Sequence, residues 1–190
     1  MNFVEPIRSL EDIEKIKNLL KNRKRDYLLF CFGINTGLRI SDILSLNVVD
    51  VLNKNYVTII EKKTKKRKKI VLNTTLKILI KNFLLDKNND EALFKTRFNN
   101  RLDRVQAYRI IKNVCNKVNC NLIVGTHTLR KTFAYHHYKQ FKDVPCWSSC
   151  ITGISSSSFS RFSISKHSGA LMSSRLIPPN VGAIALTASI

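Results

Sequence analysis

The sequence predicts a mostly helical α+β domain, a helical bundle with one small antiparallel β-hairpin, over about residues 1–143. Apolar residues recur at the spacing of buried helix faces in several stretches of this region. One stretch, Tyr56–Glu61 (YVTIIE), is instead rich in β-forming residues. A basic run and a second short apolar stretch, Ile70–Leu72, follow it, which is typical of two strands joined by a turn.

The first three helices carry recognisable start and stop signals. The segment Ser9-Leu10-Glu11-Asp12 resembles a capping box, and apolar residues follow it at helical spacing up to Leu20. A second apolar helix is expected from about Tyr27 to Asn35, with Gly37 as its left-handed terminator. A short helix is expected from about Ser41 to Leu46.

The remaining helices are expected at residues 76–84, after Asp103 and from about Thr126 to Phe141. Asp103 is a residue type that caps helices well. The last helix has Leu129 and Phe133 as its expected apolar contacts. The apolar stripe of the helix after Asp103 is expected to consist of Val105, Tyr108, Ile111, Cys115 and Val118.

The charge of the chain indicates a polyanionic partner. Lys and Arg number 33 against 13 Asp and Glu, which gives a formal net charge of +20 over 190 residues. A domain this basic is typical of nucleic-acid binding, with a ribosomal type of RNA binder as the competing interpretation. A basic protein of the membrane surface fits less well, and no run of about 18 apolar residues predicts a membrane span.

The cysteines predict a reducing environment. The five Cys form no C-x-x-C pair and have no His at zinc-finger spacing. Cys31 and Cys115 lie on apolar helical faces and are predicted to be buried free thiols. The N-terminal residues lack the apolar core of a signal peptide, so we expect a cytoplasmic location.

Two basic features are candidates for binding an anion. In Gly125–Lys131 (GTHTLRK), His127 and Arg130 are three residues apart, which places them on one face if the segment is helical. Arg can hold two phosphate oxygens, and His can give or take a proton. The second feature is the basic run 62–69 (KKTKKRKK). Taken alone, either feature is also compatible with solvated polar residues that bind nothing.

Three segments together resemble the catalytic domain of tyrosine recombinases, the phage integrase family. They are residues 33–46 (GINTGLRISDILSL), residues 69–72 (KIVL) at the end of the basic hairpin, and residues 125–139 (GTHTLRKTFAYHHYK). The resemblance covers about residues 3–143. It leaves no room for the DNA-binding core domain that normally precedes the catalytic domain, so a stand-alone catalytic domain is expected.

The resemblance implies a catalytic role for four residues: Arg39, Lys63, His127 and Arg130. Such enzymes cut DNA without a metal or other cofactor, by attack of a tyrosine hydroxyl on a phosphodiester. Two Arg would stabilise the charge on the phosphate, the hairpin Lys would protonate the leaving oxygen, and His would accept the phenol proton. Neighbouring lysines could substitute for Lys63. The residues expected to contact DNA are Lys62, Lys65, Lys66, Arg67, Lys68 and Lys131.

The sequence departs from the family pattern where the nucleophile belongs. The windows for the second His or Trp and for the Tyr fall near Thr152 and Phe162, and neither contains that residue. No Tyr follows Tyr138. Tyr138 itself lies eight residues beyond Arg130, roughly 12 Å along the same predicted helix, and is expected to pack or to contact a phosphate.

Composition changes at the same place. All 13 acidic residues lie in 1–143, and residues 144–190 are rich in Ser, with four in a row at 155–158. A shifted or replaced reading frame after about Asp143 would explain this aberrant tail, and a divergent regulatory segment is the alternative. Either way we expect 144–190 to be poorly ordered.

Three functions compete. The first is a DNA recombination or integration protein of a phage or other mobile element, inactive alone because its nucleophilic Tyr is missing. The second is a non-catalytic DNA-binding protein or partner subunit that occupies recombination sites. The third, an unrelated RNA-binding protein, leaves the spaced motifs unexplained. The expected partners are double-stranded DNA and, on it, either further copies of the chain or intact recombinase subunits, which in some relatives lend their Tyr to a neighbour.

Limited proteolysis tests the expected boundary. We predict a resistant fragment that ends near Asp143, because residues 144–190 have little apolar surface with which to offset the entropy of ordering. Mass spectrometry of the fragment gives its end point. Equal resistance of 144–190 would contradict the prediction.

Overall fold

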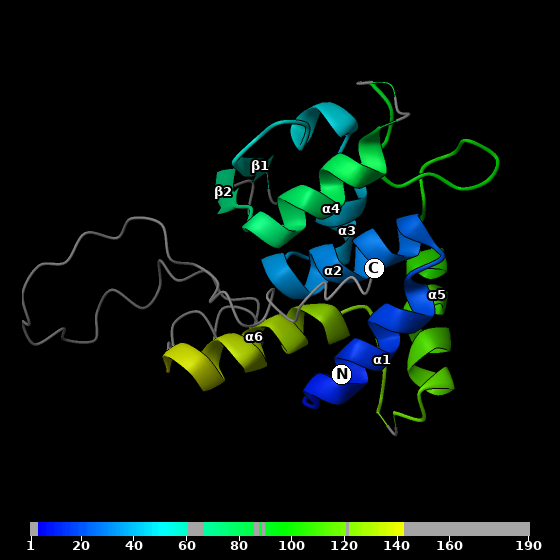
Figure 1. The fold of residues 1–190 in the computed structure, drawn as a ribbon, viewed down its shortest axis with the longest axis vertical. Coiled ribbons are helices and arrows are strands. Elements are labelled where there is room, and N and C mark those ends of the chain that lie inside the picture. Colours follow the sequence, from blue (N-terminus) through cyan, green and yellow to red (C-terminus); the bar gives the residue numbers. More distant parts are fainter. Residues whose placement is uncertain (1–3, 61–66, 86–87, 89, 121, 143–190) are drawn as a thin grey trace, which may run out of the picture.

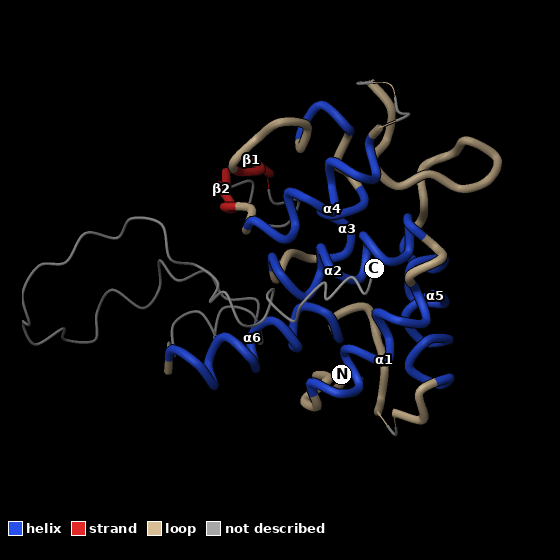
Figure 2. The backbone as a smooth tube through the Cα atoms, in the orientation of Figure 1, coloured by secondary structure: helices blue, strands red, loops and turns tan. Residues whose placement is uncertain are grey.

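The fold is a helical bundle with a two-stranded antiparallel sheet on one side, as the sequence predicts (Figures 1 and 2). The computed structural model describes residues 4–60, 67–85, 88, 90–120 and 122–142, so the predicted tail 144–190 lies outside them. The described elements are α1 (Leu10–Leu20), α2 (Lys24–Thr36), α3 (Ile40–Leu44), a 3-10 turn (Val48–Asp50), β1 (Tyr56–Ile60), β2 (Arg67–Val71), α4 (Thr74–Leu84), α5 (Arg104–Lys117) and α6 (Thr128–Phe141).

Helix α2 is the centre of the bundle. It contacts α1, α3, α4 and α6, and Figure 1 shows it between α4 on one side and α6 on the other. Residues 28–34 are all buried, because a helix that is apolar on every side can be accommodated only inside the protein. Phe32 of this helix meets Phe94 edge-on, with ring centroids 6.4 Å apart. Both predicted thiols, Cys31 and Cys115, are free and buried.

Side chains cap the helices where the sequence indicates. Ser9 Oγ accepts a hydrogen bond from the Asp12 amide at 3.2 Å. Asp103 Oδ1 accepts one from the Gln106 backbone amide at 2.7 Å. In return, Gln106 Oε1 accepts a hydrogen bond from the Asp103 backbone amide at 3.2 Å. These bonds satisfy amides at the helix starts that have no partner within the helix.

The predicted apolar stripe of α5 is partly wrong. Val105 is 53 % exposed, and the buried residues of this helix are Ala107, Ile111, Val114 and Cys115. Val105 lies two residues before the buried Ala107, about 200° around the helix axis, so it falls on the opposite face from the buried stripe. Apolarity alone does not show which face of a helix packs against the protein.

The predicted hairpin is confirmed, with Tyr56 opposite Val71 and Ile60 opposite Arg67. Val57 and Ile59 point into the core, whereas Tyr56 and Ile60 are exposed. Strand β2 begins at Arg67, three residues before its predicted start. Backbone hydrogen bonds form the ladder whatever the side chains are, so pairing continues into the basic run.

Helices α2 and α6 approach closely through two glycines. A Cβ added to Gly33 would collide with Leu129, and one added to Gly37 would collide with Phe133. Gly37 also has a φ of 61°, the left-handed conformation predicted for the end of α2. The predicted apolar contacts Leu129 and Phe133 therefore do face α2.

Among the described helices, none is long and apolar enough to cross a membrane.

Replacing Gly37 by Ala should destabilise the fold by about 2–5 kcal/mol. The left-handed backbone contributes about 1–2 kcal/mol of this, and the collision with Phe133 contributes the rest. Chemical denaturation measures the loss. In a Phe133→Ala background the collision is gone, so Gly37→Ala should cost only about 1–2 kcal/mol there. Equal losses in the two backgrounds would contradict the assignment.

Candidate active site

Arg39 stands at a sharp turn between two helices. Helix α2 ends at Gly37, Leu38 is buried, and Arg39 is the N-cap residue of α3 with an extended backbone (φ −67°, ψ 143°). Its carbonyl accepts bonds from the amides of Asp42 and Ile43, at 2.9 and 3.0 Å. The backbone of Arg39 is therefore fixed by the start of α3, and its side chain is half-buried.

Arg130 is attached to the same turn from the other side. It lies in the first turn of α6 and is only 5 % exposed. Its Nη1 donates a hydrogen bond to the Gly37 carbonyl at 3.1 Å. This bond joins α6 to the turn that carries Arg39, two residues further along the chain. A buried guanidinium requires such acceptors because burial without them is costly.

His127 lies just before α6 rather than inside it. It is the N-cap residue, with φ −101° and ψ 0°, and its side chain caps nothing. The turn before it is held by Thr128, whose Oγ1 accepts a bond from the Gly125 amide at 3.0 Å. The predicted helix start near Thr126 is thus two residues early. The ring remains available, and the residue as a whole is exposed.

Electrostatics place His127 beside both arginines. Its pKa is lowered from the usual 6.5, first by partial burial of the ring and then by the positive charges of Arg130, Arg39, Lys131 and Arg104, in that order. The positive charges of Arg39 and Arg130 therefore both act on the His127 ring. At neutral pH the ring is uncharged and can accept a proton.

The N-terminal segment Val4–Ile7 braces the start of α6. Lys131 Nζ donates to the Val4 carbonyl at 2.8 Å, and the Ile7 amide donates to Thr132 Oγ1 at 2.9 Å. His136 Nε2 lies 3.0 Å from the Ile7 carbonyl. Lys131, predicted to contact DNA, thus has one bond of its ammonium group directed to the protein backbone.

The other predicted residues lie partly outside the described structure. Strands β1 and β2 are joined by residues 61–66, which include Lys62, Lys63, Lys65 and Lys66 and are not described. Arg67 and Lys68, predicted to contact DNA, are exposed on β2. Within the described ranges, no three His, Cys, Asp or Glu side chains gather as a metal site would require.

Arg104 is the residue that sequence reasoning missed. It is the first residue of α5, directly after the capping Asp103, and its charge contributes to the lowered pKa of His127. In the sequence it is one of several basic residues on a helix. Nothing in its spacing predicts that α5 begins beside the turn that carries Arg39.

Comparisons with known proteins agree with this geometry. Residues 9–145 match the phage integrase family. The chain is 50 % identical over 147 residues to the probable integrase/recombinase YoeC of Bacillus subtilis, covering 76 % of this chain and 80 % of that protein. It spans about half the length of other curated relatives, which are tyrosine recombinases about 30 % identical to it.

Solved structures show the same fold. The crystal structure of XerA recombinase matches with a TM-score of 0.69 and 19 % identity, over 84 % of this chain and 60 % of that one. A lambda integrase dimer bound to a COC′ core site matches with a TM-score of 0.64 and 14 % identity, over 88 % and 63 %.

The pKa of His127 should lie below 6.5 in the free protein and rise when duplex DNA is added. A phosphate beside the ring would offset the positive charges that now disfavour the imidazolium. Replacing Arg39 by Gln should also raise this pKa in the free protein. NMR titration of the His ring protons measures both shifts.

His136 is the matched control. Burial lowers its pKa too, but the Ile7 carbonyl and Lys139 are the other groups that act on it. Its titration should be unchanged by Arg39→Gln. A free-protein pKa above 6.5 for His127, or equal shifts of both rings, would contradict the assignment.

Proposed function

This chain belongs to the phage integrase family, and we propose that it takes part in DNA strand cleavage and rejoining of the tyrosine recombinase type. Arg39 and Arg130 hold the scissile phosphate, His127 acts beside it, and Lys63 of the hairpin protonates the leaving oxygen. The nucleophilic tyrosine comes from another subunit, so the chain is inactive alone. Residues 1–143 form the catalytic domain, and 144–190 form an aberrant tail.

The observation that supports this proposal is the position of the His127 ring, which lies in the electrostatic field of both Arg39 and Arg130. Attack on a phosphodiester places extra negative charge on the non-bridging oxygens of the transition state. Two guanidinium groups fixed in advance stabilise that charge without reorganising at the moment of reaction. The hydrogen bond from Arg130 Nη1 to the Gly37 carbonyl fixes one of these two guanidinium groups.

His127 is suited to accept a proton. Its lowered pKa keeps the ring neutral at pH 7, so that it can take the proton of the attacking phenol. The leaving 5′ oxygen then needs a proton from the opposite side of the phosphate. The family resemblance assigns this proton to Lys63, which lies outside the described residues.

Two tyrosines of the described residues, Tyr138 and Tyr27, do not suit the nucleophile's role. Tyr138 shares α6 with Arg130, about two helical turns further along. Moving it to the phosphate would unwind the helix that holds Arg130 in place. Tyr27 is partly buried, and burial with the neighbouring Cys31 raises its pKa to about 12. A neighbouring subunit assembled on DNA can supply a tyrosine without distorting α6.

The second candidate is a DNA-binding protein that does no chemistry. It is favoured by the net charge of +20 together with the missing tyrosine. Under both candidates the partner is double-stranded DNA, in line with the lambda integrase dimer whose solved structure is bound to a core site. The setting is the DNA of a phage or other mobile element, and the free thiols favour a cytoplasmic location.

A nicked suicide substrate tests the proposal. The chain alone should form no covalent protein–DNA adduct on a denaturing gel. An adduct should form on adding a tyrosine-bearing family member whose own H-x-x-R arginine is replaced by Gln. The rate should fall on the order of a hundredfold when this chain carries Arg130→Gln. Arg109→Gln, an exposed arginine of α5, is the matched control and should leave the rate unchanged.

The other outcomes separate the candidates. An adduct formed by the chain alone and lost on Tyr138→Phe would place the nucleophile on α6. DNA binding without an adduct under any condition would favour the non-catalytic protein.

A further inference from the structure

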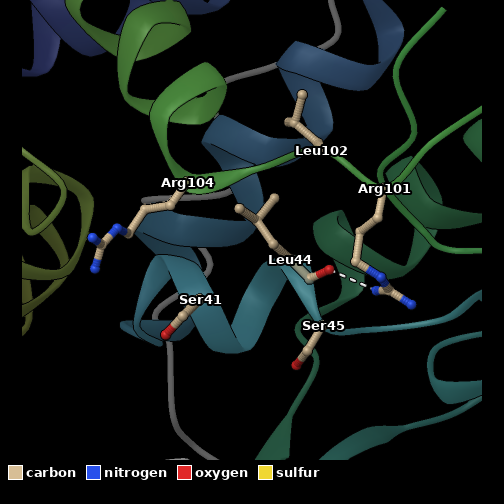
Figure 3. A pocket seen from close by; sticks show the side chains of 6 residues that line it. All are labelled: Ser41, Leu44, Ser45, Arg101, Leu102 and Arg104. Atoms are coloured by element: carbon tan, nitrogen blue, oxygen red, sulfur yellow. Dashed lines mark hydrogen bonds between the residues drawn. The ribbon is translucent and has the colours of Figure 1, made fainter. Parts of the chain in front are cut away.

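A hollow of about 420 Å³ lies beside the candidate active site, between α3 and the start of α5. It is lined by Ser41, Leu44, Ser45, Arg101, Leu102 and Arg104 (Figure 3). Two of these residues, Leu44 and Leu102, are buried leucines. The other four are polar, and none of them is acidic. A hollow with this lining is suited to an anion.

The two arginines of the hollow are used differently. Arg101 is engaged by the protein: its Nη1 donates to the carbonyls of Leu44 and Leu46, at 2.6 and 3.1 Å. Its Nη2 donates to Asn47 Oδ1 at 2.7 Å. Arg101 therefore holds the end of α3, and Figure 3 shows it on the opposite side of the hollow from Arg104.

Arg104 has no such engagement. It is exposed, and among the described residues no hydrogen bond or ion pair involves its guanidinium. Within the described ranges the adjacent Asp103 forms no ion pair with Arg104, and its Oδ1 accepts a hydrogen bond from the Gln106 amide instead. The five N–H donors of Arg104 are thus available to an external acceptor.

The serines differ in the same way. Ser45 Oγ is committed to the Asp42 carbonyl at 2.8 Å. Among the described residues, Ser41 Oγ has a single long hydrogen bond, to Asp42 Oδ1 at 3.4 Å. In Figure 3 the Ser41 and Arg104 side chains extend toward the same side of the hollow. Together they offer a charged fork and a hydroxyl donor to one anion.

The hollow adjoins the position proposed for the scissile phosphate. Ser41 follows Arg39 by two residues at the start of α3. Arg104 is near enough to His127 for its charge to act on that ring. An anion held by Ser41 and Arg104 would therefore lie beside one held by Arg39 and Arg130. Consecutive phosphates of one DNA strand are anions arranged in this way.

We propose that Arg104 and Ser41 form a second phosphate site, which binds the phosphate adjacent to the scissile one on the same DNA strand. The site sets the register of the strand, because a strand held at two consecutive phosphates cannot slide past Arg39 and Arg130. This inference rests on the proposed function, since it takes the DNA substrate from there.

Phosphate-by-phosphate neutralisation tests the site in the full chain. Methylphosphonates are placed one at a time along one strand of a duplex, and binding is measured for each. For the unaltered chain, a methylphosphonate at either of two neighbouring phosphate positions should lower the affinity roughly tenfold. Arg104→Gln should abolish the loss at one of them only, and Arg130→Gln should abolish it at the other. Ser41→Ala should reduce the affinity loss at the position assigned to Arg104 and leave the loss at the other position unchanged.

Salt dependence gives a second readout. Arg104→Gln should reduce the slope of log affinity against log salt by about 0.9, whereas Arg104→Lys should preserve it. Arg109→Gln is the control for the loss of a positive charge on α5 away from the hollow. The midpoint of thermal unfolding should be unchanged in Arg104→Gln and Arg109→Gln. Among the described residues, neither of these two arginines makes a hydrogen bond or an ion pair.

The outcomes distinguish the two proposals. If Arg130→Gln alters one position while Arg104→Gln behaves like the control, the second phosphate site is overturned and the proposed function stands. If neither variant alters any position although DNA still binds, the proposed function itself is wrong.

Discussion

The hydrogen bond from Arg130 to the Gly37 carbonyl is the interaction on which the candidate site depends. It connects the first turn of α6 to the end of α2, and so it fixes the distance between two parts of the motif that are 93 residues apart in the chain. The close approach of these helices makes the bond possible, because Leu129 and Phe133 pack directly on Gly33 and Gly37. A larger residue at either glycine would separate the helices and with them the two arginines. Packing and electrostatics are therefore coupled at one contact.

Much of the fold follows from local signals in the sequence. Ser9 and Asp103 were identifiable as caps because their side chains act on amides three residues away. Gly37 was identifiable because few other residues tolerate its backbone conformation. The prediction was wrong where the cause is not local. Val105 is apolar but lies on the exposed face of α5, and β2 continues through basic residues because its partner strand is present.

The candidate site could be predicted to the extent that its residues fall in recognisable motifs. Arg39, His127 and Arg130 belong to two such segments, and in the folded chain the charges of both arginines lower the pKa of the His127 ring. Arg104 could not be found in this way, since its proximity to His127 arises from the packing of α5 against α3. The contact of Lys131 with Val4 was equally hidden, because it joins residues 127 positions apart. Single-sequence reasoning identifies residue types suited to a reaction, and tertiary structure decides which others surround them.

The brace formed by Val4–Ile7 has a consequence for the order of folding. These residues are synthesised before the rest of the described chain, yet their partners on α6 are made last among the described helices. Contacts between such distant residues close a large loop and therefore form late. Until α6 emerges, the hydrophobic surface of α2 that it will cover is open to solvent, and the nascent chain is exposed to aggregation. The brace and α6 lie at opposite ends of the described chain. Arg39 and Arg130 can therefore come together only when nearly all of the domain has been synthesised.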